Sequence, residues 1–461
     1  MTNTPDLSHP PLYRESLRPQ FHFTARYWDD YRLNPQEHQE GWINDVNGLV
    51  HLDGVYHFFA QRWWSCWLHA VSWDLIHWQE LPPAFGKDEQ FGGTQSGGAV
   101  IDYHNTSGLA TGDIPVMIAF WSSTDNRRQC ISYSNDRGAT WTKYAGNPVL
   151  DHPERDPHVF WHEPTRQWIM ILYGPPEQSF VLFSSPNLLQ WEKHSSMPGL
   201  FECPDMFSLP VDGDLARPKW VVVDGDGSYL LGDFDGASFR PDGEKQRCER
   251  GPHFYATRTW NNLPERDGRR IQMAWMRGGE YPDQPFNQQI TFPCTLTLRT
   301  LPEGIRLCRY PIAELERLHG QTFELRDQLL SPGLDPLAQL AGELWDVEAE
   351  IDLSRSSCAR FTLGLRGTEL SYTPATGQLE LSCGSQVQIE PRGGLLQLRV
   401  LVDRMSVEVF SNQGELSLTH CVRAADRGPA LSLNAEGGPL FLRSLAVRRL
   451  DSIWEEEVGR G

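Results

Sequence analysis

The chain has 461 residues and a mass of 52.6 kDa, more than one hydrophobic core usually supports, so two domains or one large repeat architecture are expected. It carries 41 Lys and Arg against 60 Asp and Glu, a net charge of −19, which disfavours nucleic-acid and anionic-membrane partners. A mean hydropathy of −0.47 is typical of a globular protein and excludes a disordered one. No stretch approaches the roughly 20 apolar residues of a membrane helix.

The aromatic content is high, with 17 Trp, 13 Tyr and 21 Phe. Indole rings stack on the apolar faces of sugars, so carbohydrate chemistry is an early hypothesis, although a Trp-rich core would have the same composition. The nine cysteines are scattered and never in CxxC spacing, so neither a disulfide framework nor a structural metal is expected. The first 20 residues lack the pattern of a secretory signal, which predicts a cytoplasmic protein, or a secreted one if a leader has been removed.

Short β-rich runs follow the N-terminal 34 residues, which are predicted to be an extension. They alternate apolar and polar residues and end in turn-forming residues, which indicates strands joined by tight turns. The clearest runs are 48–61, 114–122, 158–174, 219–234 and 271–276. Four segments repeat a serine or glycine, a turn and a closing aromatic residue: 72–78, 134–141, 184–191 and 232–239. The closing aromatics are 63, 50 and 48 residues apart, a period that suits one four-stranded propeller blade each. Unrelated hairpins with Trp at their edges are the alternative.

The pattern changes near residue 311. A short helix is expected at 311–320, within a linker that covers 311–340 and includes a connecting segment from residue 321. Regular short strands resume beyond it and predict a β-sandwich over 341–461. Motifs with catalytic residue types gather before residue 300, so the catalytic domain is expected to be a propeller over 35–310 and the sandwich to support it.

Three acidic residues stand apart: Asp45 in WINDVNGL, Asp156 in ERDPHVFW and Glu202 in FECPDMF. Each alone has a structural explanation, because all three motifs suit turns or strand ends. Together they suggest glycoside hydrolysis, which uses two carboxyl groups in different environments. Amides beside Asp45 would keep it ionised, as a nucleophile requires. Apolar neighbours of Glu202 would disfavour its charged form, as a general acid requires.

Two prolines predict the local backbone at these acids. A residue before proline is biased towards an extended conformation, so Asp156 before Pro157 and Cys203 before Pro204 are expected to be extended. The acids lie 111 and 46 residues apart. In a propeller, that separation lets successive blades deliver them to one central site.

These residues resemble glycoside hydrolase family 32, the family of invertases, levanases and inulinases. The resemblance rests on WINDVNGL, SGGAV at 96–100, RDP at 155–157 and ECPD at 202–205, with MAWM at 273–276 and DRMSVEVFSNQGE in the tail. It covers roughly residues 35–450. The resemblance implies an all-β fold, a five-bladed β-propeller followed by a C-terminal β-sandwich. It also implies hydrolysis of terminal fructosyl units from sucrose or fructans. No cofactor and no metal are expected.

The resemblance further implies residue roles. Asp45 matches the nucleophile, Glu202 the acid/base and Asp156 the residue that stabilises the transition state, with Arg155 beside it. A retaining mechanism would place the Asp45 and Glu202 carboxyl groups about 5–5.5 Å apart. The positions that match the lining of the substrate pocket are Trp42, Asn44, Gln61, Trp67, Ser96, Arg155 and Trp275.

The sequence departs from the family pattern at Val46, Gln95 and His253, and the segment 61–67 (QRWWSCW) is short and aromatic. None of these changes removes a catalytic group, but they leave the substrate open, because loops around a site select what binds there. A fructosyltransferase would carry the same three acids. A catalytically silent carbohydrate-binding protein is the alternative from another class, and retention of the three acids argues against it. An arabinan- or xylan-cleaving hydrolase also uses three acids, but in different motifs.

Overall fold

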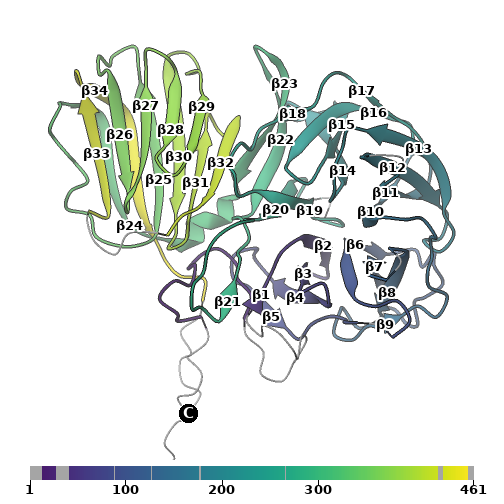
Figure 1. Cartoon of the computed structure of the whole chain (residues 1–461). Helices are drawn as coiled ribbons and strands as arrows, with labels where there is room; N and C mark the ends of the chain where they lie inside the picture. Colours follow the sequence, from purple (N-terminus) through teal and green to yellow (C-terminus); the bar gives the residue numbers. More distant parts are fainter. Residues whose placement is uncertain are drawn as a thin grey trace, which may run out of the picture.

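The computed structural model describes residues 13–26, 41–87, 89–125, 127–175, 178–264, 266–423 and 429–454. In this part of the chain almost all regular structure is β-strand, arranged as a five-bladed propeller beside a two-sheet sandwich (Figure 1). The predicted fold class is therefore confirmed. No helix among the described residues is long and apolar enough to cross a membrane.

Three blades are separate four-stranded antiparallel sheets. The first contains β2 (Val46–Leu52), β3 (Val55–Arg62), β4 (Cys66–Ser72) and β5 (Gln79–Leu81). The second contains β6 (Thr94–Asp102), β7 (Val116–Ser123), β8 (Gln129–Ser134) and β9 (Thr142–Lys143). The third contains β10 (Arg155–His162), β11 (Gln167–Gly174), β12 (Ser179–Ser185) and β13 (Glu192–Pro198).

The fourth and fifth blades are joined by a single parallel bridge between Val211 and Leu298. The fourth contains β14 (Asp205–Val211), β15 (Asp214–Val223), β16 (Ser228–Phe234), β17 (Phe239–Pro241) and the short β18 (Gln246–Arg247). The fifth contains β19 (Tyr255–Thr259), β20 (Arg270–Trp275), β22 (Cys294–Leu301) and β23 (Gly304–Pro311). Beside them, β1 (Gly41–Trp42) pairs in parallel with β21 (Phe286–Asn287).

The four repeated segments have one structural role. Each forms the turn between the third and fourth strands of its blade, after β4, β8, β12 and β16. The Ser72 and Ser134 hydroxyls accept hydrogen bonds from the backbone N–H groups of Leu75 and Gly138, both at 2.8 Å. The closing indoles of the second and third repeats donate back to the turn, each across 3.1 Å. The repeat was thus correctly interpreted as a mark of successive blades.

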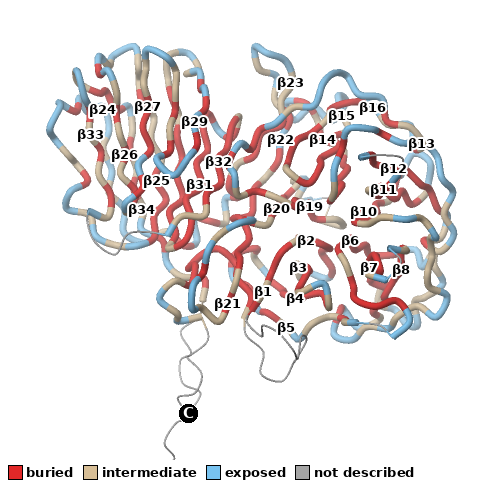
Figure 2. The backbone as a smooth tube through the Cα atoms, viewed as in Figure 1, coloured by how far each residue is buried: buried red, intermediate tan, exposed pale blue. Residues whose placement is uncertain are grey.

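The sandwich consists of a six-stranded and a five-stranded sheet, with one hydrophobic core between them. The first sheet has the order β24 (His319–Leu330), β34 (Leu440–Leu450), β25 (Trp345–Asp352), β30 (Leu395–Val402), β31 (Ser406–Ser411) and β32 (Leu416–Cys421). The second has the order β29 (Ser385–Gln388), β28 (Gln378–Leu381), β27 (Thr368–Thr373), β26 (Arg360–Leu365) and β33 (Leu431–Glu436). Buried residues recur along the strands of both sheets (Figure 2), and their side chains form this one core.

The segment between the domains is more ordered than expected. Residues 313–318 form a 3₁₀ helix, close to the predicted short helix. Residues 319–330, expected to lie in the linker, instead form strand β24, which pairs with β34 at the edge of the sandwich. Most of its side chains are exposed, so backbone hydrogen bonds to β34 hold it, and the sequence carries little of the alternation that marks a half-buried strand.

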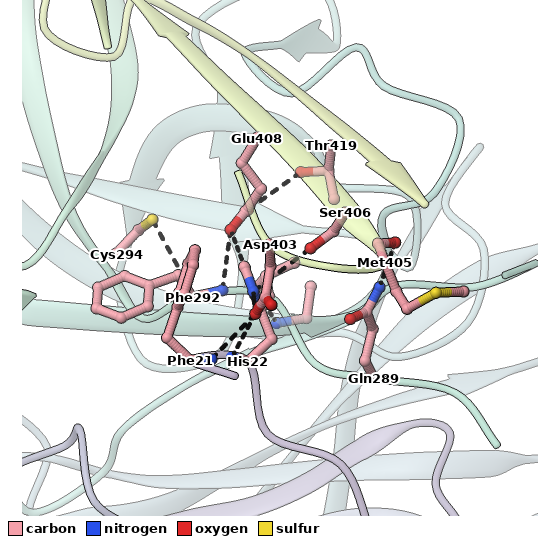
Figure 3. A network of polar contacts seen from close by, with 12 residues as sticks. Phe21, His22, Gln289, Phe292, Cys294, Asp403, Met405, Ser406, Glu408 and Thr419 are labelled. Atoms are coloured by element: carbon pink, nitrogen blue, oxygen red, sulfur yellow. Dashed lines mark hydrogen bonds and ion pairs between the residues drawn. The ribbon is translucent and has the colours of Figure 1, made fainter. Parts of the chain in front are cut away.

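The described part of the predicted N-terminal extension is residues 13–26, of which 18–25 are buried and pack against residues of both the propeller and the sandwich. Figure 3 shows its centre: His22 Nδ1 lies 2.9 Å from Asp403 Oδ2, and Nε2 lies 2.9 Å from Glu408 Oε2. Asp403 also accepts backbone N–H bonds from residues 20–22. Glu408 in turn pairs with Arg309 of the propeller at 3.2 Å. A buried ionic network thus joins the N-terminal segment to both domains.

Candidate active site

The candidate catalytic residues all lie at the beginning of the first strand of a blade. Asp45 precedes β2, Asp156 is the second residue of β10, and Glu202 lies three residues before β14. These first strands contact one another around the propeller axis: β2 touches β6 and β19, β6 touches β10, and β14 touches β19. Their amino-terminal ends therefore meet at one end of the axis, and that is where the sequence-predicted acids converge.

The Asp45 carboxylate is held by a neighbouring blade. Ser96, the third residue of β6, donates its hydroxyl to Asp45 Oδ2 across 2.6 Å. Burial raises the pKa of Asp45, and the negative charge of Glu202 raises it further, while hydrogen bonds from Ser96 and Asn44 oppose both effects. Desolvation is the larger effect, so the amide donors expected to keep Asp45 ionised act against the burial of the group.

Asp156 is almost fully buried, with 2% of its surface exposed. Its Oδ2 accepts a hydrogen bond from the backbone N–H of Cys203 at 3.1 Å and lies 3.9 Å from Arg155 Nε. Burial and the charge of Asp45 raise the pKa of Asp156 to about 7, although Arg155 and the Cys203 N–H act in the opposite direction. One carboxyl oxygen of Asp45, one of Asp156 and the Cys203 sulfur lie within 4.8 Å of one another.

Glu202 faces polar partners on both oxygens. Arg155 donates to its Oε1 and the Tyr255 hydroxyl donates to its Oε2. Its side chain is 20% exposed, and its neighbour Phe201 is 39% exposed. The predicted apolar pocket around Glu202 is therefore wrong: a guanidinium and a phenol, delivered by β10 and β19, surround the carboxyl group instead.

The backbone at this site has a left-handed conformation. The φ angles of Asp156, Glu202 and Cys203 are +65°, +52° and +44°, so the extended conformation expected before the two prolines is not found. Such angles are uncommon for non-glycine residues, and the surrounding contacts must hold them. Arg258 supplies such contacts, since its guanidinium donates to the carbonyl oxygens of Asp156 and Pro204.

Apart from Arg155, which contacts Glu202, the residues predicted to line the substrate pocket divide into two groups. Trp42 and Trp275 are partly exposed at the site. The Trp42 indole donates to Asn44 Oδ1 across 2.9 Å, and the Trp275 indole donates to Gln288 Oε1 across 3.0 Å.

The second group is hidden. Gln61 and Trp67 expose none of their surface, and Asn44 and Ser96 expose 4% and 3%. Gln61 donates its amide to Thr94 O, and the Trp67 indole donates to Gln95 O at 3.0 Å. Gln61 and Trp67 therefore support the strands that carry Asp45 and Ser96, and the structure does not place Trp67 as a wall that a sugar would touch.

Sequence reasoning missed Tyr255 and Arg258 as parts of the site. Tyr255 is the first residue of β19, so it occupies in the fifth blade the place that Asp45, Ser96 and Asp156 occupy in theirs. Because each blade places a site residue at the start of its first strand, the repeat of the blades could have indicated Tyr255. Arg258 acts through contacts to carbonyl groups 54 and 102 residues away in sequence, and no local pattern indicates such contacts.

The three departures from the family pattern are Val46, Gln95 and His253. Gln95 and His253 make structural hydrogen bonds, and Val46 is the first residue of a strand. Val46 begins β2 and is buried. The Gln95 carbonyl accepts the Trp67 indole N–H. The His253 Nδ1 accepts the backbone N–H of Cys421 at 3.1 Å, which ties the loop before Tyr255 to β32 of the sandwich.

Three histidines, which together could suggest a metal site, lie within the segment 152–162, but their side chains have separate partners. His152 contacts the Pro153 carbonyl at 2.9 Å, His158 Nε2 lies 3.2 Å from Asp205 Oδ1, and His162 contacts the Thr165 hydroxyl at 2.7 Å. Each histidine thus has its own partner.

The arrangement that can do chemistry is the set of three carboxyl groups, with two of them desolvated and the third held by a cation and a phenol.

Known proteins resemble this chain over most of its length. Residues 36–311 match the Glycosyl hydrolases family 32 N-terminal domain, and residues 314–449 match the Glycosyl hydrolases family 32 C terminal domain. The chain is 33% identical to a levanase of Bacillus subtilis (strain 168), over 98% of this chain and 73% of that protein. It is 28% identical to the extracellular exo-inulinase inuE of Aspergillus ficuum, over 94% and 96%. The crystal structure of exo-inulinase from Aspergillus awamori superposes with a TM-score of 0.82 at 26% identity, over 96% and 100%.

Proposed function

Because this chain belongs to glycosyl hydrolases family 32 and is a glycoside hydrolase, we propose that it is a retaining β-fructofuranosidase acting on terminal fructosyl residues of sucrose or fructans. The observation that carries the proposal is the convergence of Asp45, Asp156 and Glu202 at one end of the propeller axis. Relatives named levanase and exo-inulinase support a β-fructoside as the substrate.

Asp45 acts as the nucleophile in this proposal. Its carboxylate attacks the anomeric carbon of the terminal fructosyl unit, and the bond to the leaving oxygen breaks as a covalent fructosyl-enzyme forms. The hydrogen bond from Ser96 favours the ionised form of Asp45 and holds its Oδ2 in place, so the other carboxylate oxygen is left to attack. Water then cleaves the intermediate and restores Asp45, with net retention of configuration.

Glu202 acts as the acid and then the base. It gives a proton to the leaving oxygen in the first step and takes one from water in the second. A phenol can accept a hydrogen bond as well as donate one, so Tyr255 can stay bonded to Glu202 in both protonation states. Arg155 can only donate, so it can hold Glu202 in place as the carboxylate that takes the proton from water in the second step.

Asp156 binds the sugar that reacts. Its buried carboxyl group has a pKa raised to about 7, so near neutral pH it can accept a hydrogen bond from a sugar hydroxyl or donate one. A hydrogen bond in a desolvated site strengthens as charge develops on the ring, which stabilises the transition state more than the ground state. The alternative hypothesis, a fructosyltransferase, differs from this mechanism only in the acceptor of the second step, which is a sugar instead of water.

The test is incubation with sucrose, inulin and levan separately, followed by sugar analysis. Free fructose supports hydrolysis, longer oligosaccharides or cyclic products support transfer, and no turnover of any substrate contradicts the proposal in favour of a silent carbohydrate-binding protein. Retention is tested with methanol as the acceptor. A methyl β-fructofuranoside is the expected product, and the α-anomer would contradict double displacement.

A further inference from the structure

A segment of the propeller, residues 248–253, pairs with the edge of the sandwich. β32 is the edge strand of the six-stranded sheet, on the side of the sandwich that faces the propeller (Figure 1). Glu249 forms a parallel β-bridge with Ser417 of β32. The Ser417 N–H donates to Cys248 O at 2.9 Å, and the Arg250 N–H donates to Ser417 O at 2.8 Å. The segment therefore extends the sandwich sheet by a short run of backbone pairing.

The buried side chain of Glu249 fixes this pairing. Its Oε1 accepts hydrogen bonds from the backbone N–H groups of Gly251 and Thr419, at 2.7 Å and 2.9 Å. Its Oε2 accepts the Ser417 hydroxyl at 2.6 Å and lies 3.0 Å from the Thr419 hydroxyl and 3.4 Å from Arg309 Nη1. A buried carboxylate requires such donors, and three of these five belong to β32.

The segment and β32 approach each other very closely. A Cβ atom on Gly251 would lie 2.2 Å from the Thr419 nitrogen and 2.4 Å from its carbonyl oxygen, so only glycine fits there. The His253 N–H donates to Thr419 O at 3.3 Å, and the His253 Nδ1 accepts the Cys421 N–H at 3.1 Å. The contact with the sandwich thus continues to within two residues of Tyr255.

On its other side, Tyr255 is connected to the loop that carries Glu202. The Ala256 N–H donates to Gly225 O at 2.7 Å, and the Gly225 N–H donates to Phe201 O at 3.1 Å. Between these two attachments, Tyr255 donates its hydroxyl to Glu202. A displacement on the sandwich side would therefore move the phenol relative to Glu202.

We propose that Glu249 is a positioning residue for acid catalysis, because it holds its segment on β32 and so keeps the Tyr255 hydroxyl on Glu202. The proposal rests on the proposed β-fructosidase function. Proton transfer to the leaving oxygen depends on geometry, and a displacement of about 1 Å caused by a distant change can cost about 100-fold in rate. The sandwich thereby contributes to the protonation of the leaving group as well as to stability.

Thr419→Val tests the proposal from the sandwich side. The substitution keeps the shape of a fully buried side chain but removes the hydroxyl beside Glu249. Thr419→Ser retains the hydroxyl, and Thr368→Val is the matched control, a buried threonine of β27 in the other sheet. For each variant, kcat is measured on sucrose and on an aryl β-fructofuranoside, whose leaving group needs no proton, with thermal unfolding to verify folding. If Thr419→Val does not fold, Ser417→Ala removes the other hydroxyl on Glu249 and provides the same test.

We expect Thr419→Val to lower kcat about 5- to 10-fold on sucrose and less than about twofold on the aryl fructoside. Thr419→Ser should restore most of the rate on sucrose, and Thr368→Val should change neither rate. The loss on sucrose should disappear when Tyr255→Phe is already present, because Glu249 acts through that phenol. Equal losses on the two substrates, no loss on sucrose, or an undiminished loss in the Tyr255→Phe background would overturn the proposal.

Hydrogen exchange provides a readout that does not depend on turnover. Exchange of the backbone amides of residues 248–256 and 199–205 is compared between the wild type and Thr419→Val. Faster exchange in both segments supports the coupling, and unchanged exchange at 199–205 refutes it. If the wild type hydrolyses neither sucrose nor a fructan, the proposed function fails, and hydrogen exchange then decides whether the sandwich positions the loop of Glu202.

Discussion

The Ser96 hydroxyl donates a hydrogen bond to Asp45 Oδ2 across 2.6 Å and thereby joins the first strand of the second blade to the turn that opens the first. This bond favours the charged form of Asp45 against the desolvation that raises its pKa. Ser96→Ala should therefore raise the pKa of Asp45 further. The acidic limb of the pH profile of kcat/KM should move to higher pH, with a loss of about 10- to 100-fold near neutral pH.

The measurement is kcat/KM on sucrose or a fructan across pH 4–9, with Ser195→Ala as the control. Ser195 donates to Ala237 O, between β13 and the turn after β16, and contacts none of the three acids. A uniform loss with no movement of the acidic limb would show that Ser96 does not tune Asp45.

Replacement of Asp45 and replacement of Glu202 should impair catalysis in different ways. Asp45→Asn removes the nucleophile and should lower kcat by at least about 10³-fold on every substrate. Glu202→Gln should be comparably slow on sucrose but should release a burst of phenol from an aryl β-fructofuranoside, because a good leaving group needs no proton. Stopped-flow absorbance measures the burst. A burst in Asp45→Asn would reverse the assigned roles.

Tyr255→Phe removes one of the two hydrogen bonds to Glu202. The phenol can stay hydrogen-bonded to Glu202 in both protonation states, so its loss should lower kcat on sucrose about tenfold. The loss of kcat on an aryl fructoside should be much smaller, because that substrate does not need acid catalysis. Tyr103→Phe is the control, because Tyr103 is 52% exposed. Equal losses on the two substrates would indicate that Tyr255 only maintains the loop.

The His22 network predicts a pH-dependent stability. Hydrogen bonds to Asp403 and Glu408 outweigh burial and raise the pKa of His22 to about 9 from an ordinary value of 6.5. The folded state binds the proton more tightly than the unfolded state, so this stabilisation is complete below pH 6.5 and is lost as the pH rises to 9.

His22→Gln should lower the free energy of unfolding by about 3–5 kcal/mol at pH 6, with a smaller difference at pH 9. Denaturant unfolding at the two pH values measures this, and His104→Gln at an exposed position is the control. A difference that does not change with pH would mean that His22 is held neutral.

The local elements of the chain were largely predictable. Turn residues and period-2 alternation mark the strands, and the repeated turns such as 72–78 and 134–141 mark the blades, because both depend on hydrogen bonds within a few residues. Strand β24 was missed, since its exposed side chains carry no alternation and β34, over 100 residues later, holds it.

The sequence by itself determined that this is a β-propeller and sandwich chain with three distinctive acids, because turns, strands and motifs are encoded locally. The tertiary structure alone decided the burial and the neighbouring side chains of those acids. It buries Asp156 and Trp67, surrounds Glu202 with Arg155 and Tyr255, and adds Arg258. Burial, pKa and backbone strain depend on groups that lie far apart in the chain, and only the closure of the five blades brings those groups together.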